Sequence, residues 1–360
     1  MKKLYLILVL IITAVTLNAQ PQGYYDGTEG LRGEALRAAL HTIINNEDAS
    51  GHSANLSYSG LWSAYYQTDK KPGTNYVWDI YSDRPGGTTP YNYVLGSDQC
   101  GNYSEEGDCY NREHIWAQSW TNDDGIEKTD LHQVFPTDGY VNNKRGNYAF
   151  GEVASGSGTW ISENGSKLGN CITSGFNGKA FEPIDEYKGD IARALMYVSV
   201  RFYSQDGSWS TSDMTNKSVI KDWAMAMLLR WHQDDPVSEK EINRNNAVYE
   251  LQSNRNPFVD NPEFAQRIWD PNWSGIDNEY VTTMFVNVWP NPASSTVNIK
   301  GENLDAVYMY NSVGQLVLTL DVNNAEEQNS IDVSNLTSGI YFMNVISING
   351  GSVLKKVVVQ

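Results

Sequence analysis

Residues 108–120, with the sequence DCYNREHIWAQSW, set an arginine, a glutamate and a histidine side by side at positions 112–114. These three residues are unusual in a buried apolar strand, and the two tryptophans that follow are unusual in a solvated loop. Neighbouring residues on a strand face opposite ways, so Glu113 and His114 can serve one site only where a strand ends or bends. Functional residues often lie at such ends, which predicts a functional strand end here.

A second polar cluster follows at residues 130–147, DLHQVFPTDGYVNNKRGN. Leu131, Val134 and Phe135 are expected to anchor it in the core. Residues 136–138 (PTD) are predicted to begin a helix, because proline and aspartate are common at helix starts. The polar residues that follow within this helix are Asn142, Lys144 and Arg145.

The two clusters together carry the groups that metal-assisted hydrolysis of a phosphodiester needs. Glu113 and Asn142 offer oxygen atoms suited to a hard divalent cation such as Mg²⁺. The imidazole of His114 is suited to act as a general base. The side chains expected to contact substrate phosphate are Arg112, Lys144 and Arg145.

Structural roles compete with these assignments. Arg145 could instead pair with an acid such as Asp138, and Arg112 could belong to a structural ion pair. We expect His132 to be structural, and Trp116 and Trp120 to belong to the core rather than to a base-stacking surface.

The two motifs resemble the bacterial endonuclease I family, secreted non-specific nucleases with a ββα-metal (His-Me finger) site. The resemblance extends from about Leu61 to Trp269. It implies two strands and a helix around one cation, with His114 as the general base and Glu113 and Asn142 as metal ligands. Where some members carry another acid, this chain has Lys128, so no third protein ligand is assigned and water is expected to complete the coordination.

The N-terminus has the layout of a secretory signal peptide at residues 1–19, with two lysines before a short apolar run and Ala19 at its end. Export makes disulfides possible. Cys100 and Cys109 could close a small loop, but with Cys171 as a third cysteine the sequence leaves the pairing open.

The chain changes character near residue 286, where short alternating apolar runs begin and predict a small β-sandwich. This tail resembles the C-terminal sorting domain of the type IX secretion system, on the segments WPNPASSTVNI, VYMYNSVGQLV, IDVSNLTSGIYFMNV and KKVVV. The resemblance implies that the secretion machinery is a partner. The expected domains are a signal peptide (1–19), an endonuclease domain (20–285) and a sorting domain (286–360).

The central part mixes helices and strands, which predicts an α+β class. Helices are expected over residues 31–44, 189–204 and 217–233 from their apolar spacing. A strand is expected over residues 77–83, and a surface loop or hairpin over 155–169. Residues 272–284 are expected to form a linker.

The formal net charge of −17 opposes binding to a polyanion. The tail from Val286 contains three basic and six acidic residues, so most of the acidic excess precedes it. An anionic substrate must therefore be met by local basic residues or a bound cation.

Together these observations predict a protein that is secreted or held at the cell surface, without a membrane span and acting as a monomer. Its expected activity is metal-dependent, non-specific endonuclease cleavage of DNA, RNA or both. Mg²⁺ is the expected cofactor, and Mn²⁺ or Ca²⁺ can occupy the same ligands. The rival classes are an adhesive or glycan-binding surface protein and, less favoured because no HExxH motif occurs, a zinc peptidase.

Overall fold

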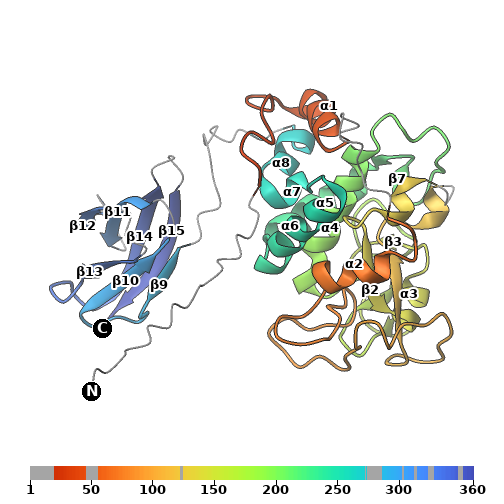
Figure 1. The fold of residues 1–360 in the computed structure, drawn as a ribbon, viewed down its shortest axis with the longest axis horizontal. Coiled ribbons are helices and arrows are strands. Elements are labelled where there is room, and N and C mark those ends of the chain that lie inside the picture. Colours follow the sequence, from red (N-terminus) through yellow and green to blue (C-terminus); the bar gives the residue numbers. More distant parts are fainter. Residues whose placement is uncertain are drawn as a thin grey trace, which may run out of the picture. The chain divides into compact units, whose positions relative to one another are not determined.

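The computed structural model describes residues 20–45, 56–121, 125–271, 273, 286–301, 304–311, 314–322, 328–347 and 352–360. Its contacts divide the chain into two units, Met1–Trp273 and Ser274–Gln360 (Figure 1). The predicted signal peptide and, apart from Trp273, the predicted linker lie outside the described residues, so the stated domain limits remain predictions. Among the described residues no helix is long and apolar enough to cross a membrane.

A strand pair and a short helix form the part of the first unit that carries both motifs. Strand β1 (Tyr110–His114) pairs antiparallel with β2 (Val134–Asp138), and helix α3 (Gly139–Arg145) follows directly. The side chain of Asp138 caps the helix by accepting a hydrogen bond from the backbone N–H of Val141. The helix therefore begins at Gly139, and residues 136–138, which were expected to begin it, belong to β2 instead.

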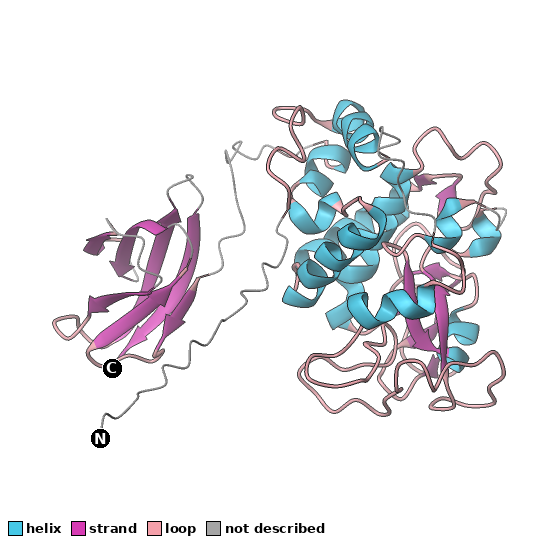
Figure 2. Ribbon diagram, viewed as in Figure 1, coloured by secondary structure: helices cyan, strands magenta, loops and turns pink. Residues whose placement is uncertain are grey.

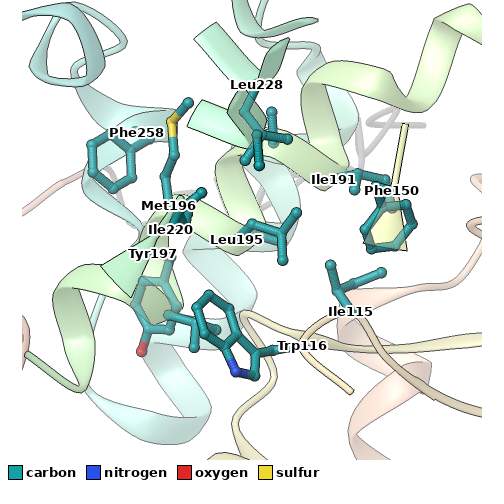
Figure 3. Packing of buried hydrophobic residues seen from close by; sticks show 14 of the residues in the cluster. Ile115, Trp116, Phe150, Ile191, Leu195, Met196, Tyr197, Ile220, Leu228 and Phe258 are labelled. Carbon is teal, nitrogen blue, oxygen red and sulfur yellow. The ribbon is translucent and has the colours of Figure 1, made fainter. Parts of the chain in front are cut away.

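Helix α4 (Lys188–Arg201) runs through the centre of the first unit and is buried along nearly its whole length. Apolar residues of α4 pack against Ile115 and Trp116, which follow β1, and against Phe150. On other helices they meet Leu228 and Phe258 (Figure 3). Helices α1 (Gly33–Ile44), α5 (Asp222–Asp234) and α7 (Pro257–Asp260) pack directly against α4, and the unit also contains α6 (Glu239–Gln252) and α8 (Phe264–Trp269).

Arg193 is the most deeply buried of the charged side chains on α4. The Arg193 guanidinium pairs with Glu241 of α6 and donates a hydrogen bond of 2.9 Å to the carbonyl of Asp235. A buried cation needs such partners, because leaving it unpaired costs several kcal/mol, about 3–5 when one member of a pair is removed. The pair therefore fixes how α6 lies against α4.

The remaining strands of the first unit form two small sheets beside the helices (Figure 2). One has the order β3-β6-β5-β4 and the other pairs β7 with β8. Their bounds are β3 (Ala149–Phe150), β4 (Trp160–Ile161), β5 (Lys167–Asn170), β6 (Lys179–Glu182), β7 (Thr215–Asn216) and β8 (Val219–Ile220). The hairpin expected within residues 155–169 is formed by β4 and β5. The helix expected from residue 217 begins only at Asp222, because β8 occupies the residues before it.

The strand expected over residues 77–83 does not form: Val77 makes an isolated bridge with Lys70, and residues 80–82 form a turn. The buried side chain of Asp79 accepts hydrogen bonds from the backbone N–H groups of Tyr81 (2.9 Å) and Ser82 (3.0 Å). A carboxylate that bonds the backbone two and three residues ahead curls the chain instead of extending it. The strand predicted for this segment was therefore wrong.

The second unit is the expected β-sandwich. Its sheets have the orders β13-β10-β9 and β12-β11-β14-β15, and they enclose one apolar core. The strands are β9 (Asn287–Trp289), β10 (Thr296–Lys300), β11 (Leu304–Asn311), β12 (Leu316–Asp321), β13 (Gln328–Asp332), β14 (Gly339–Ser347) and β15 (Ser352–Val359). The two units together confirm the α+β class with an all-β tail.

The cysteine pairing that the sequence left open is resolved in the structure. Cys100 and Cys109 form a disulfide, and Cys171 is a buried free thiol. The disulfide closes a loop that ends immediately before β1, so it ties residues 99–101 to the start of the strand.

Candidate functional site

Glu113 and His114 lie where β1 ends, as their adjacency in the sequence predicted. The strand register sets Glu113 opposite Phe135 and His114 opposite Val134. Strand alternation sends the two side chains to opposite faces, and the backbone bends at Ile115 and Trp116 directly after the strand. Helix α3 lies on the face to which Glu113 points, as the contacts of its side chains show.

Glu113 is 2% exposed, and its carboxylate has two partners on the same oxygen. Oε1 accepts a hydrogen bond from the hydroxyl of Tyr81 at 2.6 Å and forms an ion pair with Nη1 of Arg145 at 2.9 Å. Burial raises the pKa of the Glu113 carboxyl, while Arg145 and Tyr81 oppose that rise. The carboxylate is thus held in a fixed orientation in a poorly solvated place.

The turn at residues 79–82 delivers Tyr81 to this carboxylate. Besides bonding its own turn, Asp79 accepts a hydrogen bond of 2.8 Å from the backbone N–H of Asp138. Burial raises the pKa of Asp79 to about 7, and the neighbouring carboxylate of Asp83 contributes to the rise. The turn is therefore joined to the end of β2, which fixes the position of the Tyr81 hydroxyl relative to the strand pair.

Arg145 is 1% exposed and lies between helix α3 and the end of strand β1. In addition to Glu113, its guanidinium donates to the carbonyl of His114 at 2.9 Å and to that of Ile115 at 2.7 Å. Its acidic partner is Glu113 and not Asp138. These contacts give Arg145 a structural role, so the expectation that it contacts phosphate is not retained.

Asn142 and Arg145 are three residues apart on α3 and therefore share one helix face, which packs on β1. The Asn142 Nδ2 group donates to Oδ1 of Asn111 at 2.7 Å and to the carbonyl of Arg112 at 3.2 Å. These two bonds fix which end of the amide is the oxygen. Within the part of the chain that the structure describes, no hydrogen bond reaches Asn142 Oδ1.

His114 is oriented by the main chain. Its Nε2 lies 3.0 Å from the carbonyl oxygen of Lys128, in a short 3₁₀ helix, Ile126–Thr129. A carbonyl only accepts, so Nε2 carries the proton and, in the neutral ring, Nδ1 is the basic nitrogen. The Tyr58 ring stacks beside the imidazole, with centroids 6.0 Å apart and planes 26° apart.

Three cationic side chains near the end of β1 lie over aromatic rings. The guanidinium of Arg112 lies 3.5 Å from the Tyr58 ring centroid, and the Lys128 ammonium lies 5.3 Å from the same ring. Lys144 lies 5.0 Å from the ring centroid of Tyr140 on α3. Arg112, Lys128 and Lys144 are all partly exposed.

Other residues discussed from sequence have structural roles. His132 is buried, and burial lowers its pKa to about 4. Trp116 and Trp120 are core residues, 1% and 4% exposed.

Sequence reasoning missed Tyr81, Tyr58 and Asn111. Only Asn111 had a local signal, since it lies two residues before Glu113 and so on the same strand face.

Comparisons with known proteins identify the family to which this chain belongs. The model for Endonuclease I matches residues 32–263, and that for the secretion system C-terminal sorting domain matches residues 287–360. The chain is 36% identical over 259 residues to the extracellular ribonuclease of Bacillus subtilis (strain 168), covering 70% of this chain and 80% of that protein.

Two further relatives agree with this result. An extracellular ribonuclease of Bacillus amyloliquefaciens is 37% identical over 262 residues, covering 71% of this chain and 81% of the relative. Endonuclease-1 of Buchnera aphidicola subsp. Baizongia pistaciae (strain Bp) is 29% identical over 133 residues, covering 37% and 46%. By these matches the chain belongs to the endonuclease I family, and so is a nuclease, and it ends in a secretion sorting domain that assigns it to the cell surface or the medium.

Proposed function

We propose that the first unit cleaves phosphodiester bonds of DNA and RNA with one divalent cation, held by Glu113 and Asn142, and with His114 as the general base. The observation that carries the proposal is the pair of oriented oxygen ligands on β1 and α3. Glu113 is fixed by Tyr81 and Arg145, and the amide of Asn142 is fixed through its nitrogen. Both are held before any ligand arrives, which lowers the cost of binding.

The ligand chemistry fits a hard cation. A carboxylate and an amide oxygen suit Mg²⁺, which usually keeps several waters and few protein ligands. Among the described residues, no group of three or more His, Cys, Asp or Glu could hold a metal ion by itself. Water and substrate oxygens would therefore complete the coordination, and the bound cation would neutralise charge on the phosphate.

The buried position of Glu113 fits the same assignment. Burial disfavours its charge, and one guanidinium and one hydroxyl oppose this effect only in part. A cation at the carboxylate would stabilise the charged form further. Mn²⁺ accepts the same ligands and is expected to substitute for Mg²⁺.

His114 would take a proton from the attacking water. The hydrogen bond from Nε2 to the Lys128 carbonyl fixes the ring and leaves Nδ1 as the basic atom. A base oriented by a second group in this way is the usual arrangement for general-base catalysis. The proton would thus pass to Nδ1 as the water oxygen bonds to phosphorus. The P–O bond to the leaving sugar oxygen would break in the same displacement, and that oxygen would take a proton from water.

Phosphate contacts would come from Arg112 and Lys144, whose charges lie on partly exposed side chains. Both are held against aromatic rings, which restricts their motion and limits the entropy lost on binding. Arg145 acts instead by holding Glu113. Two relatives are named as extracellular ribonucleases, which supports including RNA among the substrates.

The sandwich would serve export and not chemistry. Its family match supports the type IX secretion machinery as its partner. An adhesive or glycan-binding role for this module is the alternative. Deletion of residues 286–360 distinguishes the two, because it should block release from the cell only if the module serves export.

Cleavage should stop when divalent cations are removed. With excess chelator we expect no nicking of supercoiled plasmid and no degradation of a structured RNA, and added Mg²⁺ should restore both, because the scissile phosphate then regains its charge partner. Gel electrophoresis of both substrates measures this. Undiminished cleavage in excess chelator would refute the metal-dependent mechanism.

Substitutions should separate the base from the ligands. His114→Ala should lower the turnover number by about 10²–10⁴-fold, the usual worth of general-base assistance, and leave Mn²⁺ affinity nearly unchanged. Glu113→Gln and Asn142→Ala should weaken Mn²⁺ binding, and excess Mg²⁺ should recover part of their activity. Calorimetric titration and single-turnover kinetics make the comparison. A fully active His114→Ala at saturating Mg²⁺ would show that another group is the base.

Tyr81→Phe should loosen the cation site without removing a ligand. It deletes the hydroxyl that bonds Glu113 Oε1, and losing such a supporting contact typically costs about 10–100-fold in metal affinity. Tyr91→Phe is the matched control, because the Tyr91 hydroxyl bonds Ser82 and Glu106 instead. Mn²⁺ titrations of both variants measure this. If the two variants bind Mn²⁺ with equal affinity, Tyr81 does not support the cation site.

A further inference from the structure

An open hollow of about 420 Å³ lies beside the site, and of its lining residues the proposed chemistry uses only Arg112, as a phosphate contact. Its volume falls in the range of small-molecule sites, roughly 300–1,000 Å³. The wall comes from the start of α2 (Leu61–Thr68) and the residues before it, from the disulfide loop and from β1. The lining residues are Tyr58, Trp62, Gln99, Cys100, Gly101, Asn111 and Arg112.

The hollow borders both halves of the proposed machinery. Asn111, in its wall, accepts the hydrogen bond that orients Asn142. Tyr58, also in its wall, stacks on His114. A group bound in the hollow would therefore lie next to the scissile phosphate.

A flat guanidinium flanked by aromatic rings forms one wall. Arg112 lies 3.5 Å from the ring centroid of Tyr58 and 4.2 Å from that of Trp62, and its Nη1 donates to the Tyr58 carbonyl. No other hydrogen bond of the guanidinium is formed within the described residues. Arg112 therefore has a fixed plane and N–H groups that remain available to a phosphate.

Polar groups stand at the edges of the same hollow. The side-chain amide of Gln99 and the Nδ2 of Asn111 form no hydrogen bond within the described ranges. The disulfide between Cys100 and Cys109 holds the Gln99 segment against the start of β1. Aromatic faces for stacking, amides for a polar edge and a cation for phosphate are the features that bind unpaired nucleotides.

We propose that this hollow binds one unpaired nucleotide of the substrate, next to the phosphate that is cleaved. The nucleobase lies against the surface made by Trp62 and Arg112, with the Gln99 and Asn111 amides at its polar edge. A base inside a duplex cannot enter, because its faces and its pairing edge are already occupied. The inference rests on the proposed nuclease mechanism and deepens it: the preferred substrate class is single-stranded nucleic acid.

The test compares cleavage of one labelled oligonucleotide as a single strand and annealed to its complement, with DNA and RNA versions of each. The parent should favour the single strand. Trp62→Leu should lower kcat/KM on the single strand by about 5- to 150-fold, the loss expected for one base–aromatic stacking contact, and should affect the duplex much less. Gln99→Ala should reduce the same preference by a smaller factor.

Tyr66→Leu is the matched control. Tyr66 lies on the same helix, is 48% exposed and does not line the hollow, so its loss should leave both activities unchanged. Binding of a fluorescent single-stranded oligonucleotide in the presence of chelator supplies a readout without cleavage. There too Trp62→Leu should raise Kd and Tyr66→Leu should not.

The outcomes separate this inference from the mechanism on which it rests. A parent that cleaves neither single strand nor duplex overturns the proposed function itself. A parent that cleaves, but whose strand preference and Kd are the same in folded Trp62→Leu and Gln99→Ala, overturns the nucleotide subsite alone. If Trp62→Leu does not fold, as circular dichroism would reveal, Gln99→Ala decides, because Gln99 lies in a partly exposed loop.

Discussion

The guanidinium of Arg145 joins the last turn of helix α3 to the end of strand β1, and the geometry of the site depends on this contact. One side chain neutralises Glu113 and satisfies the carbonyls of His114 and Ile115, just where the strand pairing ends. Burying such a pair has a desolvation cost that only good geometry offsets. Here the three contacts of one rigid fork provide that geometry, so strand end, helix and carboxylate are positioned together.

Local arrangement also explains how a chain with a net charge of −17 can act on a polyanion. Coulomb interactions between exposed charges are screened over about 8–10 Å at ordinary ionic strength, so the nearest charges matter most. Arg112 and Lys128 rest on the ring of Tyr58 beside His114. A cation between Glu113 and Asn142 would add to them at the point where the phosphate must lie.

The sequence was sufficient for the parts of the site that are local. The adjacent pair at 113 and 114 predicted a strand end, and Asn142 with Arg145 at three-residue spacing shares one helix face against that strand. The central apolar helix was also predictable, since its periodicity is strong. The resemblance of the two motifs to a known family supplied the finger arrangement that spacing alone could not give.

The predictions from sequence that failed concern contacts between distant segments, or side chains that bond their own backbone. Residues 77–83 were expected to form a strand, yet Asp79 accepts hydrogen bonds from two N–H groups ahead of it, and the chain turns. Tyr81 and Tyr58 reach the site from segments more than thirty residues upstream of their partners, Glu113 and His114, and no local pattern identifies such pairs. Arg145 looked like a phosphate ligand because burial of a charge is invisible in sequence.

The central claim, that one cation lies between β1 and α3, is most directly tested by anomalous diffraction from crystals soaked in Mn²⁺. We expect a single strong manganese peak about 2.1 Å from a carboxylate oxygen of Glu113 and from Oδ1 of Asn142, with water at the remaining positions. A manganese peak at another carboxylate, with none between these two oxygens, would contradict it.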